Sequence, residues 1–314
     1  MKPIRVVLGT MTFGKQVDEK AADLIVKTFL DHGYSELDTA FRYIGGKTEE
    51  ILGRILSPSV RAKILLATKV FPEKPAGFSP QQIVEQVETS LKRLQTDWID
   101  LLYLHRPDTQ TPIEVTLQTC QNLFRQGKIR QLGLSNYAAW QVADIWHICK
   151  QNDWVLPATY QGLYNALSRN VEPELFPAIR KFNLNFYAYN PLAGGLLTGK
   201  YRDIKKIPDD GRFFHKQFYQ DRFWKASYFN AIEEIRKPCN SHGISMAEAA
   251  LRWLKHHSTM KGAYNDGIIV GVTSIDHLNA NLQACEAAEL PPAIVEACDK
   301  AWEIAKMDCP QYFR

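Results

Sequence analysis

The chain has 314 residues, of which 45% are hydrophobic and 23% are charged, and its formal net charge is +4 at pH 7. This composition predicts a sizeable core, and no apolar run is long enough to span a membrane. The positive charge is not gathered in a basic run, which favours a phosphorylated cofactor over a nucleic acid as ligand. The N-terminal apolar run is too short for a signal peptide, so we expect a cytoplasmic protein.

Eight short runs of β-branched or apolar residues alternate with amphipathic stretches along the chain. The predicted strands are 6–9, 36–40, 64–70, 100–105, 130–136, 158–162, 186–190 and 267–271. Predicted helices include 18–31, 80–94, 112–126, 138–151, 245–257 and one that follows Thr273 and Ser274. Additional helices are predicted at 228–239 and 292–306, with a long segment at 199–227. Eight βα units favour a closed (β/α)8 TIM barrel over an open sheet. We expect residues 1–314 to form one domain.

The cysteines and histidines show no pattern typical of a metal site. The six cysteines include no CxxC pair, so we expect reduced thiols. His256 and His257 are adjacent, but neighbouring residues of a helix point in different directions. We therefore expect no bound metal ion.

Four polar residues lie at the ends of predicted strands two to four, where barrels of this kind carry their active sites. Asp38 ends strand two, Tyr43 follows on the next loop, and Lys69 and His105 end strands three and four. Each alone has an ordinary explanation, such as a helix cap or a core histidine. Together, Lys69 would lower the pKa of the Tyr43 phenol, Asp38 would keep Lys69 charged, and His105 would orient a carbonyl. The set predicts a carbonyl reductase with Tyr43 as general acid.

The later strand ends offer groups for a hydride-donating cofactor. Amide and hydroxyl side chains could recognise a carboxamide, and a tyrosine face could stack on a flat ring. These residues are Ser135, Asn136, Gln161 and Tyr189. The Gly-rich segment 194–200 nearly matches a P-loop, but Tyr201 replaces the Ser or Thr that would hold magnesium. No GxGxxG follows a strand, so the cofactor would not be held as in a Rossmann fold.

Seven motifs resemble the aldo-keto reductase superfamily, in the order of that family and over nearly the whole chain. They are "LGTMTFG", "ELDTAFRY", "ATKV", "DLLYLHRPD", "IRQLGLSNY", "YQGLYN" and "NPLAGGLLTGKY". The resemblance implies a catalytic tetrad of Asp38, Tyr43, Lys69 and His105, with NADPH as the cofactor. The implied cofactor contacts are Asp38, Ser135, Asn136, Gln161, Tyr189, Asn190, Pro191, Leu192, Gly194, Gly195, Leu197, Lys200, Arg212, Thr273, Ser274, His277 and Asn281.

The motifs "GRFF", "YQDRFW" and "CPQYFR" resemble the aflatoxin aldehyde and succinic semialdehyde reductase branch. This resemblance implies that the substrate contacts Tyr43, His105, Tyr219, Arg222 and Arg314, and that the C-terminal loop closes over the barrel mouth. Guanidinium groups there would suit a carboxylate-bearing or dicarbonyl substrate. The branch also implies a homodimer that prefers NADPH, and a fixed cation at Arg212 would favour the extra phosphate of NADPH.

Two other functions are compatible with the pattern. Lys69 could form a Schiff base in a lyase, although that chemistry needs a neutral amine, which a close Asp38 opposes. The chain could instead be a cofactor-binding regulatory subunit of the same fold. We expect a small carbonyl substrate and neither nucleic acid nor membrane as partner.

Overall fold

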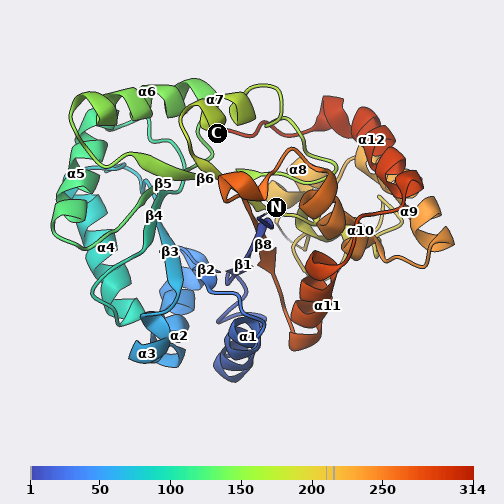
Figure 1. Ribbon diagram of the computed structural model, residues 1–314, viewed down its shortest axis with the longest axis horizontal. Coiled ribbons are helices and arrows are strands. Elements are labelled where there is room, and N and C mark those ends of the chain that lie inside the picture. Colours follow the sequence, from blue (N-terminus) through green and yellow to red (C-terminus); the bar gives the residue numbers. More distant parts are fainter. Residues whose placement is uncertain (1, 210, 215) are drawn as a thin grey trace.

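Eight parallel strands close into a barrel in the computed structural model, which describes residues 2–209, 211–214 and 216–314 (Figure 1). Each strand pairs with the next along the chain, and the first also pairs with the last to complete the ring. The predicted TIM barrel is therefore confirmed. The strands are β1 (Arg5–Gly9), β2 (Glu36–Asp38), β3 (Leu65–Val70), β4 (Leu101–Leu104), β5 (Leu132–Ser135), β6 (Pro157–Leu163), β7 (Asn185–Tyr189) and β8 (Gly267–Gly271).

Helices form an outer layer around the strands (Figure 1). Those of the described residues are α1 (Glu19–Asp31), α2 (Lys47–Ile55), α3 (Pro58–Arg61), α4 (Pro80–Leu94), α5 (Ile113–Arg125), α6 (Ala139–Gln151), α7 (Leu175–Lys181), α8 (Gln217–Phe223), α9 (Ala226–Ser241), α10 (Met246–Arg252), α11 (Ile275–Glu286) and α12 (Pro292–Ala305). All eight predicted helices are confirmed, including α11 after Ser274. The sequence does not predict α2, α3, α7 or α8, because helices of nine residues or fewer leave too little periodic pattern.

Side-chain caps explain where several helices begin. The side chains of Asp18, Ser79, Ser245 and Ser274 each accept a hydrogen bond from the main-chain N–H three residues later. Such a bond satisfies one of the four N–H groups that a helix start leaves unpaired. The two helices added to the barrel plan, α9 and α12, pack against each other at one side of the ring (Figure 1).

Strand alternation divides the core into two regions. Leu66 and Val70 of β3 belong to the large cluster beneath the helices, whereas Ala67 packs with Leu101 and Tyr103 in a separate cluster. Successive side chains of a strand point to opposite faces, so Lys69 points into the barrel together with Ala67. This alternation delivers a charged side chain to the interior.

His256 and His257 have structural partners. They lie in a π-helical turn, Trp253–His257, that follows α10. His256 Nε2 lies 2.8 Å from the Ala287 carbonyl oxygen, and the Leu290 N–H donates to His257 Nε2 at 3.0 Å. Both rings therefore bind the connection between α11 and α12.

Among the described helices, none has both the length and the apolar character needed to cross a bilayer.

Candidate active site

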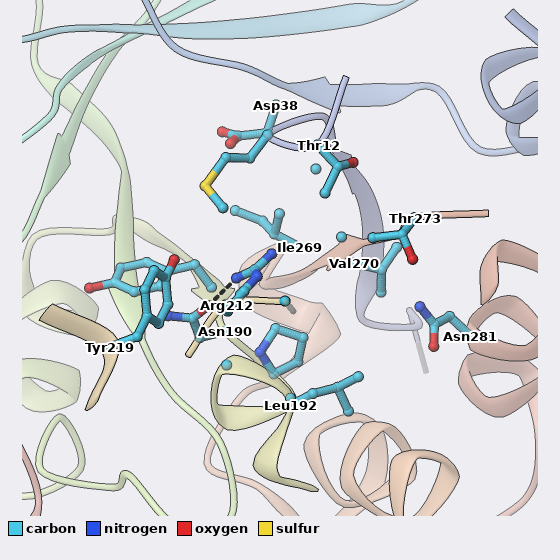
Figure 2. A pocket seen from close by; sticks show the side chains of 18 of the residues that line it. Thr12, Asp38, Asn190, Leu192, Arg212, Tyr219, Ile269, Val270, Thr273 and Asn281 are labelled. Carbon is cyan, nitrogen blue, oxygen red and sulfur yellow. Dashed lines mark hydrogen bonds between the residues drawn. The ribbon is translucent and has the colours of Figure 1, made fainter. Parts of the chain in front are cut away.

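A cavity of about 740 Å³ opens at the C-terminal ends of the strands. Figure 2 shows Thr12, Asp38, Arg212, Ile269 and Asn281 arranged around it. The cavity therefore lies at the end of the barrel where the sequence predicts the active site.

A buried ion pair lies at the base of this cavity. Lys69 is completely buried, and its Nζ lies 2.5 Å from Asp38 Oδ1 and donates to the Thr39 carbonyl oxygen at 2.7 Å. The other carboxylate oxygen of Asp38 accepts from Gln161 Nε2 at 2.7 Å. Burial lowers the pKa of Lys69 below its ordinary value, although the Asp38 carboxylate opposes this effect. Strands β2, β3 and β6 thus contribute one connected polar group.

Tyr43 lies beside this ion pair and keeps its proton at neutral pH. Lys69 Nζ is 5.1 Å from the centroid of the Tyr43 ring. Burial raises the pKa of Tyr43 well above its ordinary value, and the negative charge of Asp38 raises it further. The sequence analysis expects the pKa of Tyr43 to lie below its ordinary value, and that expectation was wrong. Asp38 neutralises much of the Lys69 charge, so burial decides the direction.

His105 provides an uncharged imidazole next to Tyr43. The two ring centroids are 6.2 Å apart in an edge-on arrangement. Burial lowers the pKa of His105 well below its ordinary value, and the positive charges of Lys69 and Arg314 lower it further. Among the described residues, Nδ1 has no hydrogen-bond partner. A proton there would be an unsatisfied buried donor, which favours the tautomer protonated at Nε2.

The ends of β5 and β7 form a second polar group. Asn136 Nδ2 donates to Ser135 Oγ and to the His105 carbonyl oxygen, each at 2.9 Å. Asn136 Oδ1 accepts from the Tyr189 hydroxyl at 2.7 Å. These hydrogen bonds fix an amide and two hydroxyl groups around the part of the cavity next to His105.

Three arginines surround the cavity. Arg212 Nη1 donates to Asn190 Oδ1 at 2.8 Å, the contact marked by a dashed line in Figure 2. The Nη2 atoms of Arg222 and Arg314 lie 3.4 and 3.5 Å from the Tyr189 hydroxyl oxygen. Burial alone would raise the pKa of Tyr189, but the charges of Arg222 and Arg314 outweigh it and lower the pKa. The C-terminal residue is thereby brought to the cavity, as the sequence resemblance implies.

Most of the expected cofactor residues line the cavity. They are Asp38, Ser135, Asn136, Gln161, Tyr189, Asn190, Pro191, Leu192, Gly194, Gly195, Lys200, Arg212, Thr273, His277 and Asn281. Leu197 and Ser274 do not line it. The Leu197 side chain is buried in the core, and Ser274 Oγ caps α11 by accepting from the His277 N–H. The expected substrate residues all line the cavity: Tyr43, His105, Tyr219, Arg222 and Arg314.

The loop after β1 also lines the cavity, although the sequence analysis assigns it no site residue. Thr10, Met11, Thr12 and Gln16 contribute to the wall. Thr12 Oγ1 donates to the Val272 carbonyl oxygen at 2.6 Å, which joins this loop to the end of β8. The motif "LGTMTFG" gave a usable signal, because it ends a predicted strand at the same end of the barrel.

Comparison with known proteins agrees with this geometry. The Aldo/keto reductase family matches residues 5–303. The chain is 48% identical over 319 residues to Aflatoxin B1 aldehyde reductase member 2 of Rattus norvegicus, a match that covers 98% of this chain and 87% of that protein. It is 46% identical over 321 residues to Aldo-keto reductase family 7 member A3 of Homo sapiens, with 98% and 96% covered. The chain therefore belongs to the aldo/keto reductase family.

Proposed function

We propose that the chain reduces aldehydes to alcohols with NADPH, and that Tyr43 is the general acid. The observation that carries this proposal is the convergence of a protonated phenol and a neutral imidazole in the lining of one cavity, with a buried ammonium 5.1 Å from the centroid of the phenol ring. These are the groups that protonation of a carbonyl oxygen requires. We also propose a homodimer, as the resemblance to the aflatoxin aldehyde reductase branch implies.

The cavity residues suit a nicotinamide cofactor. Ser135, Asn136 and Gln161 present hydroxyl and amide groups that match a carboxamide, and Tyr189 offers a face for the ring. Lys200 and Arg212 would face the phosphates, and Arg212, fixed by Asn190, would favour NADPH over NADH. When bound, the cofactor supplies a hydride to the carbonyl carbon.

Side chains of the protein supply the proton that the reaction needs. Tyr43 donates its phenolic proton to the carbonyl oxygen as negative charge develops there. An alkoxide is far more basic than a phenolate, so a phenol with a raised pKa still donates readily. Lys69, 5.1 Å from the ring, stabilises the phenolate that forms. His105 donates from Nε2 to the same oxygen and holds it beside Tyr43.

The substrate class follows from the arginines near Tyr189. Arg222 and Arg314 place two guanidinium groups within 3.5 Å of one hydroxyl oxygen, with Tyr219 also lining the cavity. Two forked donors suit a carboxylate or a second carbonyl on the substrate. The names of the relatives support aldehydes of the aflatoxin dialdehyde kind, and the arginines support semialdehydes such as succinic semialdehyde.

The Schiff-base alternative conflicts with the surroundings of Lys69. Its ammonium group has no exposed surface and is engaged by Asp38 and the Thr39 carbonyl oxygen. Lys69 also does not line the cavity. A nucleophilic amine must be free of an ion-pair partner and must reach its substrate, and Lys69 meets neither condition.

Arg222→Met tests the substrate class. Methionine keeps the apolar stem and removes the charge, so KM for succinic semialdehyde should rise about tenfold or more, as loss of a charged hydrogen bond predicts. KM for butanal, which has the same number of carbons and no carboxylate, should not change. NADPH consumption measured at 340 nm reports both constants. Absence of NADPH consumption with either aldehyde, or an equal effect of Arg222→Met on both, would contradict the proposal.

A further inference from the structure

The loop that carries Tyr43 has an unusual backbone. Ile44, Gly45 and Gly46 have φ angles of 50°, 65° and 97°, three consecutive residues in the left-handed region. This conformation is costly for a β-branched residue such as Ile44, so it persists only where surrounding contacts enforce it. The position of the phenol therefore depends on what holds this loop.

Arg93 of α4 holds the loop from outside the cavity. Its Nη1 donates to the Phe41 carbonyl oxygen at 3.2 Å, and its Cζ lies 4.7 Å from the centroid of the Phe41 ring. The guanidinium also occupies the space beside Gly46, because a Cβ there would lie only 2.3 Å from Arg93 Cζ. Glycine at position 46 thus has two roles. It adopts the left-handed backbone without strain, and it leaves room for the Arg93 guanidinium.

Glu49 ties Arg93 to the strand that carries Lys69. Its carboxylate is completely buried in the first turn of α2, and Oε2 lies 3.2 Å from Arg93 Nη1. Oε1 accepts from Thr68 Oγ1 at 2.7 Å. Thr68 precedes Lys69 on β3 and points toward the helices, while Lys69 points into the barrel. Neither Glu49 nor Arg93 lines the cavity.

We propose that Arg93 is a positioning residue that, through Glu49, fixes the loop carrying Tyr43 relative to the strand carrying Lys69. The inference rests on the proposed role of Tyr43 as proton donor. It assigns a function to a partly buried ion pair whose two members do not line the cavity. Arg93 Nη1 meets both the main-chain carbonyl and the carboxylate while the planar guanidinium lies over the Phe41 ring, and lysine has no planar group for that stacking.

The chain offers a matched control at the other end of the barrel. Arg61 is buried more deeply than Arg93. Its Nη1 lies 2.7 Å from Asp100 Oδ2, its Nη2 donates to the Trp98 carbonyl oxygen at 2.7 Å, and its Cζ lies 4.6 Å from the centroid of the Trp98 ring. This arrangement repeats that of Arg93, but it supports the beginning of β3 and β4 and lies far from Tyr43 along the strands. Arg61→Lys therefore reports the general cost of disturbing such an ion pair.

The experiment compares Arg93→Lys with Arg61→Lys. Both variants should lose thermal stability, which differential scanning fluorimetry measures. Only Arg93→Lys should lower kcat, by roughly tenfold or more, since small displacements of a catalytic group are costly. Its solvent deuterium isotope effect on kcat should increase, because transfer of the proton from a displaced phenol becomes limiting. NADPH affinity, measured by fluorescence titration, should stay at the wild-type value in both variants.

Two results would overturn the role of Arg93: wild-type kcat in Arg93→Lys, or an equal loss of kcat in Arg61→Lys. If Arg93→Lys gives no folded protein, the isosteric Thr68→Val variant removes only the hydrogen bond to Glu49. A lower kcat with unchanged NADPH affinity is then expected, and wild-type kcat overturns the inference. Failure of the proposed function is distinguishable, because it would appear as absence of NADPH consumption by the unaltered chain or as full turnover in Tyr43→Phe.

Discussion

At the scale of single residues, burial sets the protonation states that the reaction needs. It raises the pKa of Tyr43 well above the ordinary 10.0 and lowers the pKa of His105 well below the ordinary 6.5. The acid therefore keeps its proton and the imidazole stays neutral over a wide interval. Both pKa shifts depend on where the side chains lie in the folded protein. The sequence therefore identifies Tyr43 and His105 but does not show whether their pKa values are raised or lowered.

These shifts predict a flat pH profile for aldehyde reduction. Between pH 6.5 and pH 10 neither group should change its charge, so kcat should be constant when aldehyde and NADPH are saturating. The rate should fall only as acid protonates His105 below its lowered pKa, or as base ionises Tyr43 above its raised pKa. Steady-state measurements in overlapping buffers test this prediction, and a decline between pH 7 and pH 9 would contradict it.

At the scale of elements, the C-terminal segment after α12 closes one side of the cavity. The Tyr312 hydroxyl donates to Glu174 and accepts from the Ala139 N–H at 3.1 Å. The Arg314 main-chain N–H donates to the Asn136 carbonyl oxygen at 3.0 Å. Residues 309–314 therefore connect α12 to the end of β5, and they place Arg314 in the wall of the cavity.

Loosening this segment should weaken the binding of anionic substrates. Deletion of residues 309–314 removes Arg314, and KM for succinic semialdehyde should rise about tenfold or more. Tyr312→Phe keeps every other residue and removes only the two hydroxyl contacts, so a smaller rise is expected. Steady-state kinetics with butanal as the uncharged comparison measure both effects. A loss of the same size for butanal would show that the segment acts on the whole cavity.

At the scale of the whole molecule, the order of strands and helices was predictable from the sequence. Alternating β-branched and amphipathic runs placed all eight strands, and Asp38 and Lys69 were assigned because each ends one of them. The loop after β1 was missed because its lining residues, Thr10, Met11, Thr12 and Gln16, carry no titratable group that would mark a site. The pairing of Arg93 with Glu49 could not be predicted, because it depends on two helices that meet only in the folded barrel.

The Tyr43→Phe variant tests the central claim, that this barrel is an aldehyde reductase with the Tyr43 phenol as its acid. Phenylalanine keeps the ring above Lys69 and removes only the proton donor, so the cavity and NADPH affinity should be preserved. Turnover of succinic semialdehyde should fall roughly 10²- to 10⁴-fold, the usual contribution of general acid catalysis. The measurement pairs fluorescence titration of NADPH with kcat for each protein. Unchanged NADPH binding with that loss of kcat is the predicted result, and wild-type turnover in Tyr43→Phe would contradict it.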